Sequence, residues 1–199
     1  MPDERHLERL RTRRIEPEFR LFDLRVMPDA VVELCPDDAR FKELATVLQP
    51  RSGNELIEWL GVPGGGEIIE GEPPREIPAH LVHRGDSELM RRATEIAGLN
   101  FAGRTDHLNE ESLGLLDRWA EEYRFEFPAF VLNDIYVHRG AQLMLASPLL
   151  LARYITVEHG GTIVIPAGRH TKIDCRGIQS QSPISSVNLA NKYILKLVA

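Results

Sequence analysis

Two stretches of the sequence, IYVHRGAQLML (135–145) and ITVEHGGTIVI (155–165), align without a gap at a constant offset of 20 in the numbering. In each stretch apolar residues alternate with polar ones, which predicts two strands that each bury one face. Gly140 aligns with Gly160, and glycine between two strands predicts a tight bend. Because one strand–bend–strand unit cannot bury its own apolar face, we expect the two units to stack with matched apolar residues in contact.

The stretch from Leu24 to Leu34 fits the same pattern, and its numbering differs from that of the first unit by a constant 111. It predicts strand, bend and strand, with the bend at Met27-Pro28-Asp29. A less regular third unit follows the second, at offsets of 18, 18 and 17 in the numbering. Its members are Ile173, Cys175 and Gly177, matched with Ile155, Val157 and Gly160.

This repeat resembles that of right-handed parallel β-helix proteins, the architecture of pectate lyases and of many surface and assembly proteins. The resemblance implies an α+β fold with a short single-stranded right-handed β-helix (β-solenoid) and an inserted or appended helical subdomain. The alternative is a β-sandwich or jelly roll with antiparallel strands, which would show similar alternation without requiring a constant offset.

The remaining sequence predicts helices at apolar positions of helical spacing. One is expected from Phe41 to Leu48, a short one after Asn54, one from Leu89 to Ala97 ended by Gly98, and one from Asn109 to Tyr123. The predicted organisation is a polar tail at 1–20, a strand pair joining the stack at 21–36, a helical subdomain at 37–124 with a Gly/Pro-rich loop at 62–78, and the β-solenoid with a C-terminal cap or strand at 125–199.

Composition bounds the class of protein. The chain has 199 residues, of which 43% are hydrophobic and 27% charged, and this suits one soluble globular unit. The net charge of -6 argues against a nucleic-acid partner. No apolar run approaches the ~18 residues of a membrane span, and the first residues lack a signal peptide, so we expect no membrane partner and a cytoplasmic location. Cys35 and Cys175 are too far apart in sequence for a CxxC motif, and no cofactor or metal site is predicted.

The stack predicts two columns of outward side chains as candidate binding residues. One column holds His138, Glu158 and Arg176, and the other holds Tyr136, Thr156 and Asp174. Such a face could bind a polar ligand against the Tyr136 ring, with acid–base chemistry between Glu158 and His138. The interpretation that we favour is a solvated sheet face whose charges prevent aggregation. No motif of a known catalytic class is present, so no catalytic residue is assigned.

These observations favour a non-enzymatic structural, assembly or protein-interaction module. The expected partner is a second copy of the chain or another protein, because the apolar tail at 187–199 needs a cap or a partner. The alternative is a carbohydrate-binding or carbohydrate-active protein that holds a glycan on the two outward columns.

Overall fold

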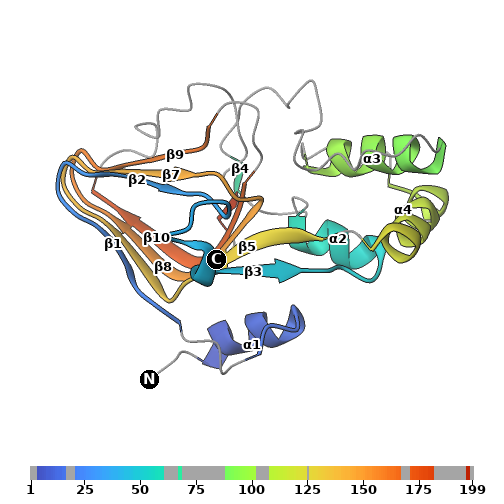
Figure 1. Ribbon diagram of the computed structural model, residues 1–199, viewed down its shortest axis with the longest axis horizontal. Coiled ribbons are helices and arrows are strands. Elements are labelled where there is room, and N and C mark those ends of the chain that lie inside the picture. The colour runs from blue at the N-terminus through green and yellow to red at the C-terminus, as the bar shows by residue number, and fades with distance from the viewer. Residues whose placement is uncertain are drawn as a thin grey trace.

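The computed structural model describes residues 4–16, 21–60, 67–68, 88–101, 108–124, 126–166, 171–181 and 196–197. The protein is α+β, with two neighbouring sheets that share one core and with helices around them (Figure 1). The first sheet has six strands in the order β1-β6-β8-β5-β3, and β10 pairs with the other edge of β8. The second sheet has three strands in the order β2-β7-β9.

The strands of the first sheet are β1 (Leu24–Val26), β3 (Ala45–Leu48), β5 (Phe127–Val131), β6 (Asp134–Val137), β8 (Leu149–Val157) and β10 (Lys172–Ser180). Those of the second are β2 (Val31–Leu34), β7 (Gln142–Leu145) and β9 (Thr162–Val164). A separate short pair joins β4 (Glu67–Ile68) to β11 (Lys196–Leu197). The helices are α1 (Glu4–Thr12), α2 (Gly53–Leu60), α3 (Glu88–Phe101) and α4 (Glu110–Tyr123), with a single 3₁₀ turn, η1, at Lys42–Leu44.

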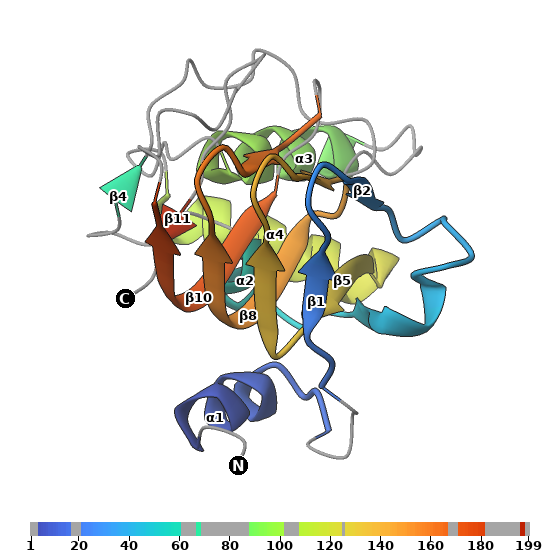
Figure 2. The same ribbon diagram turned by 90° about the vertical axis from the view of Figure 1, so that its left-hand side faces the viewer.

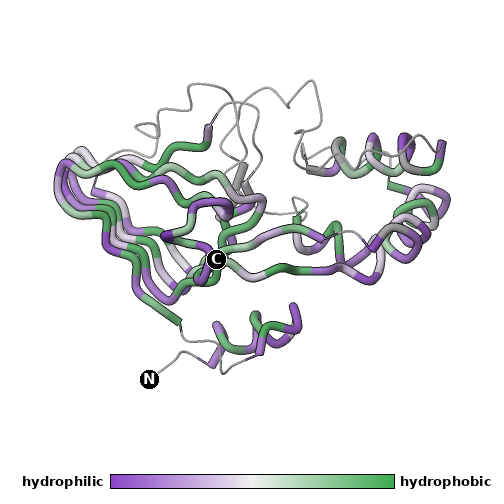
Figure 3. The backbone as a smooth tube through the Cα atoms, viewed as in Figure 1, coloured by the Kyte–Doolittle hydropathy of each residue, from purple (hydrophilic) through white to green (hydrophobic). Residues whose placement is uncertain are grey.

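The register predicted from the repeat is confirmed. Ile135 pairs with Ile155 between β6 and β8, as the offset between the two aligned stretches requires. Leu24 pairs with Ile135 between β1 and β6, as the match of the N-terminal stretch to the first unit requires. The second sheet keeps both offsets between β2, β7 and β9. Because the pairs are in register, residues of similar hydropathy lie side by side across neighbouring strands (Figure 3).

The bends between the two sheets explain the aligned glycines. Gly140 and Gly160 have φ angles of 68° and 73°, a left-handed conformation that glycine adopts without a steric penalty. Asp29 occupies the matching place in the first unit, with a φ angle of 59°. Asparagine and aspartate tolerate this conformation better than other residues do. The three bends therefore stack, and the strands on both sides keep their register.

The predicted fold, a single-stranded right-handed β-solenoid, is wrong. The first sheet is mixed, because β3 runs antiparallel to β5, and it curls like half a barrel beside the second sheet (Figure 1). The repeat fixes which residues pair between neighbouring strands, but it does not fix how the strands close around the core. The alternative, an antiparallel β-sandwich or jelly roll, is also wrong, because β1, β6, β8 and β10 are joined by parallel pairs.

The predicted register of the third unit is wrong as well. Ile173 pairs with Leu150 of β8 rather than with Ile155, which pairs with Ile178 instead. The reason is the length of the two strands, because β10 pairs with β8 along all of β8, from Leu149 to Val157. A long ladder buries Ile173 and Cys175 against the first half of β8, and it satisfies more backbone groups than the predicted short one.

Two helix predictions need correction. The predicted helix from Phe41 to Leu48 is a 3₁₀ turn followed by β3, whose Ala45 pairs with Phe130 of β5. Tertiary pairing overrides a short helical pattern here. Helix α3 continues past Gly98 to Phe101, so Gly98 does not end it. The predicted loop at 62–78 and tail at 187–199 lie outside the described residues, apart from β4 and β11.

Two apolar cores fix the position of the helices. The first fills the space between the two sheets and includes Val26, Val137 and Val157. The second lies on the other side of β5 and β8, where Leu10 of α1, Trp59 of α2 and Trp119 of α4 pack against Leu149 and Leu151. The Asn109 side chain accepts a hydrogen bond from the Ser112 amide at 2.9 Å, which confirms the predicted cap of α4. Among the described helices, none is both long and apolar enough to cross a membrane.

Candidate functional site

Four of the six predicted binding residues lie together on the side of the first sheet that faces away from the core between the sheets. We call this side the outer face. Tyr136 and Thr156 are paired residues of β6 and β8. His138 Nδ1 lies 3.2 Å from Glu158 Oε1, and the Arg139 amide donates to Glu158 Oε2 at 3.0 Å. The structure therefore brings these four side chains together, and their role in binding stays a prediction.

Asp174 and Arg176 do not extend the two predicted columns. The shift in register places Asp174 opposite Leu151, where it is buried. Arg176 is exposed and lies over the ring of Tyr154, at 5.7 Å from its centre. The predicted six-residue set is therefore divided between an exposed part and a buried one.

The outer face also carries residues that the sequence patterns did not single out. Arg153 bonds to Asp134 in an ion pair between β8 and β6. Tyr154 is 39% exposed, and the Arg153 guanidinium lies 5.6 Å from the centre of its ring. Arg25 of β1 lies over the Tyr136 ring at 4.5 Å. The sequence held one signal for Arg153 and Tyr154, which is a break in the alternation along β8. Leu150 and Ala152 face the core, and so do Ile155 and Val157, which leaves two consecutive residues outside it.

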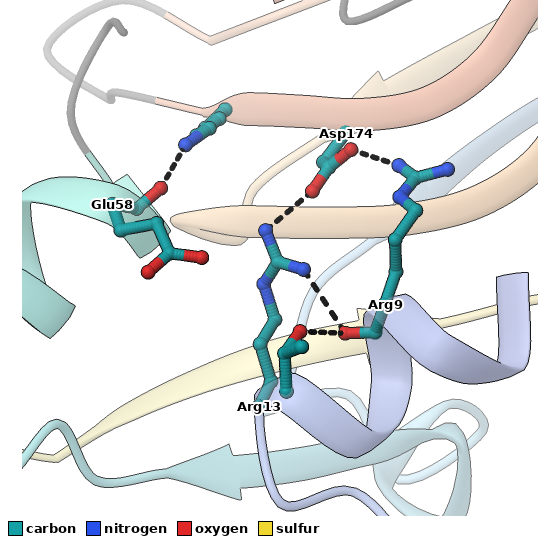
Figure 4. Close-up of polar contacts among 6 residues, drawn as sticks. Arg9, Arg13, Glu58 and Asp174 are labelled. Carbon is teal, nitrogen blue, oxygen red and sulfur yellow. Dashed lines mark hydrogen bonds and ion pairs between the residues drawn. The ribbon is translucent and has the colours of Figure 1, made fainter. Parts of the chain in front are cut away.

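Asp174 belongs to a buried ionic cluster between α1 and β10 (Figure 4). Arg9 of α1 and Arg13, the residue that follows α1, both bond to its carboxylate. Arg13 Nη1 also donates to the Arg9 carbonyl at 3.0 Å. On the same strand the Lys172 ammonium donates to the main-chain carbonyl of Glu58 at the end of α2. The cluster therefore ties α1 and α2 to the sheet.

Burial controls the ionisation of this region. It lowers the pKa of Arg13 to about 10, with a further decrease from Arg9, and it also lowers the pKa of Arg9. His6, buried on α1, has its pKa lowered to about 4 by burial and by the nearby Arg9. Nε of Arg13 has no hydrogen-bonding partner among the described residues, and the Leu132 backbone contributes a hydrogen-bonding interaction to the His6 ring that opposes the drop in its pKa. Uncompensated polar groups of this kind are costly to bury, so α1 depends on the Asp174 carboxylate for its place.

Metal ligands and the buried thiol bear on what chemistry the described residues could support. They contain no group of three or more His, Cys, Asp or Glu side chains that could hold a metal ion. Burial raises the pKa of the Cys175 thiol to about 11, so it stays protonated and is a poor nucleophile near neutral pH.

A different surface stands out at the end of the strand stack. Residues 21–48, which we call the end row, hold β1, β2 and β3. These strands pair with β6, β7 and β5, which are consecutive in the chain. No described strand pairs with the other edge of β1, β2 or β3. Figure 2 shows β1 at this open edge.

The end row also collects exposed apolar side chains. Four of the five large exposed apolar side chains that the described residues contain lie in it, and the fifth is Tyr154. They are Phe22 (46% exposed), Met27 (60%), Val31 (64%) and Val47 (63%). Leu24, Ala30 and Val32 point into the core between the sheets but are only partly buried, because no described strand lies beyond β1 and β2 to cover them. Apolar side chains gathered at an unpaired strand edge are typical of a contact surface.

Comparisons of the chain with family models, with curated proteins and with solved structures found no match. The function is therefore inferred from the geometry and charge of these surfaces.

Proposed function

We propose that the protein is a non-enzymatic interaction or assembly module that binds its protein partner through the end row. The observation that supports this proposal is the coincidence of exposed Phe22, Met27, Val31 and Val47 with the unpaired edges of β1, β2 and β3. An unpaired edge presents main-chain N–H and C=O groups that another strand can bond. Apolar side chains beside that edge add surface to be buried on binding.

The end row carries features that limit indiscriminate aggregation. Pro28 and Asp29 form the bend between β1 and β2, and Glu33 places an exposed carboxylate on β2. Natural proteins place charges and proline at edge strands for this reason. An edge that is protected against random pairing and yet retains apolar side chains favours one specific partner.

The proposal is tested by changing one apolar residue of the end row. Val31→Lys places a charge in the contact surface, and the protein should lose its partners. Tyr154→Lys is the matched control, because it makes the same kind of change on the outer face. Thermal unfolding of both variants checks that each is folded.

The measurement is quantitative mass spectrometry of proteins that co-purify with tagged protein from its native cells. We expect wild-type protein and the Tyr154→Lys variant to retain the same partners, and the Val31→Lys variant to lose them. Equal retention by the folded Val31→Lys variant would overturn the proposal. So would the absence of any retained protein with the wild type, including a second copy.

A second candidate is glycan binding on the outer face. It is favoured by the exposed ring of Tyr154 beside Arg153 and Arg176, with Tyr136 two strands from Arg176. Arg25 lies over the Tyr136 ring at 4.5 Å, closer than Arg153 and Arg176 lie to the Tyr154 ring, so Tyr154 is the better platform for a sugar. A glycan array with wild-type protein and the Tyr154→Ala variant tests this candidate, and a glycan bound by the first and lost by the second would support it.

A further inference from the structure

We infer that the partner is an extended, basic and apolar peptide segment, which adds as a strand along the open edge of β2. This inference rests on the proposed function, and it names the chemistry of the partner that the end row fits. Three features of β2 and its surroundings lead to it: the direction of its main-chain groups, the alternation of its side chains and the local charge.

The main-chain groups of β2 show where a strand can bond. The Ala30 carbonyl accepts from the Gln142 amide at 2.8 Å, and the Leu34 carbonyl accepts from the Ala146 amide at 3.0 Å. Since main-chain groups of a strand alternate between its two edges, Val31 and Glu33 direct their N–H and C=O groups away from β7. These groups face the edge at which no described strand pairs.

The side chains of β2 then define what the added strand should contain. Val31 and Glu33 lie exposed on one face, whereas Val32 and Leu34 point into the core between the sheets. A strand beside β2 would place a β-branched residue, such as threonine, next to Val31 and a basic residue next to Glu33, because opposite charges in cross-strand pairs are favourable. Its residues beside Val32 and Leu34 would be apolar and would cover the exposed end of the core.

The charge around β2 points to the same partner. Residues 26–39 contain Asp29, Glu33, Asp37 and Asp38, and no lysine or arginine. Asp38 pairs with Arg40. The other three carboxylates form no ion pair within the described part of the chain. Arg25 and Arg40 flank this stretch, and Arg40 interacts electrostatically with Glu33, but the acidic residues outnumber them, so the net negative charge attracts a cationic segment.

The same charge disfavours a second copy of the chain. Two end rows brought edge to edge would place the carboxylates of one copy beside those of the other, and like charges across paired strands are destabilising. The net charge of -6 adds to this repulsion. A basic segment relieves the repulsion that a second copy would increase.

The experiment uses the full chain and three synthetic peptides. The first is acetyl-Ser-Val-Thr-Val-Lys-Val-Thr-Val-Ser-amide. The second has Glu in place of Lys, and the third has Pro in place of both Thr residues, which removes main-chain donors. Affinities come from calorimetric titration at low salt, and the binding surface comes from amide shifts of ¹⁵N-labelled protein.

We expect the Lys peptide to bind about tenfold more tightly than the Glu peptide, and the Pro peptide to bind least. Amide shifts should concentrate in residues 21–48. The Glu33→Lys variant should reverse the preference between the Lys and Glu peptides. Glu121→Lys, an equal change in net charge on α4, should preserve it.

Equal affinities for the Lys and Glu peptides, tight binding of the Pro peptide, shifts centred elsewhere or an unchanged preference in Glu33→Lys would each overturn the inference. If no peptide binds but the Val31→Lys variant loses its cellular partners or a wild-type dimer, this inference fails and the proposed function stands. If no peptide binds and the Val31→Lys variant keeps its partners, both fail.

Discussion

The outer face and the end row belong to the same strand stack, but they differ in whether their carboxylates form ion pairs within the chain. On the outer face Asp134 bonds to Arg153, and Glu158 bonds to His138. Under α1, Asp174 bonds to two arginines. In the end row, Asp29, Glu33 and Asp37 form no ion pair with a described residue, although Glu33 lies near enough to Arg40 to raise the pKa of that guanidinium. Charges that are paired within the chain stabilise its fold or cost it little, whereas unpaired ones beside an open strand edge are available to another molecule.

The largest effect on stability is expected for the buried ion pairs of Asp174 under α1. Asp174→Ala removes the carboxylate that bonds to both Arg9 and Arg13, so we expect the free energy of unfolding to fall by about 3–5 kcal/mol. Glu33→Ala in the end row should change it by no more than about 0.5 kcal/mol. Urea denaturation measures both. Equal stability of the two variants would show that the buried cluster does not hold α1 in place.

Acidification should weaken the region under α1 before it affects the end row. The pKa of His6 is about 4 in the folded chain, against about 6.5 when unfolded, so below pH 6.5 protons bind preferentially to the unfolded chain. Stability from neutral His6 is complete above pH 6.5 and is lost as the pH falls toward 4, by about 2 kcal/mol at pH 5.

Urea midpoints of wild-type protein at pH 7 and pH 5 test this expectation. Besides the Leu132 backbone, the groups that face His6 are Arg9, Asp134 and Arg153, and the last two are already paired. A His6→Leu variant should show a much smaller drop between the two pH values. His159→Asn, on an exposed bend, should keep the wild-type drop. If that variant lost the drop, the pH dependence of stability would come from His159 rather than from His6.

A smaller effect is expected where the end row meets the rest of the stack. A Cβ at position 140 would lie 2.3 Å from Asp29 Oδ1, in a left-handed conformation. Gly140→Ala should therefore cost about 1–2 kcal/mol and displace the Asp29 bend. Gly114→Ala in α4 meets no atom within 4 Å and should stabilise the protein by up to about 1 kcal/mol. Thermal unfolding that ranks the two variants the other way would contradict the stacked bends.

The smallest effect is expected on the outer face. Replacing His138, Glu158 and Arg176 together by alanine should leave the fold intact, because partly exposed pairs contribute about 0–1 kcal/mol each. The triple variant should also bind the Lys peptide as wild type does. If it loses a glycan or other ligand that the wild type binds, the outer face is the functional surface and the comparison with the end row is reversed.

The sequence predicted the local neighbours of the central strands well. The constant offsets gave the pairs Ile135 with Ile155 and Leu24 with Ile135, and both are confirmed. The aligned glycines predicted the positions of the bends, and Asn109 predicted the start of α4. Each of these features depends on periodicity, on backbone conformation or on a short-range hydrogen bond, all of which the residue types specify directly.

Other features depended on contacts that no local pattern encodes. Ala45–Leu48 became β3 because β5, which lies far later in the chain, offered an antiparallel edge. The register of β10 followed from the whole length of β8 rather than from the bend glycine. The predicted site lost Asp174 for this reason and lacked Arg25, Arg153 and Tyr154, which the curled sheet brings beside it.

By itself the sequence determined which residues of 24–34, 135–145 and 155–165 face the core and which neighbours they meet in adjacent rows, because alternation and bend chemistry are local. Only the tertiary structure decided that the sheet is mixed and curled, that Asp174 lies under the distant Arg9 and Arg13, and that residues 21–48 form an open edge. Those outcomes follow from burial and strand pairing over the whole molecule. The free energy of such contacts depends on which distant segments exclude water from each group.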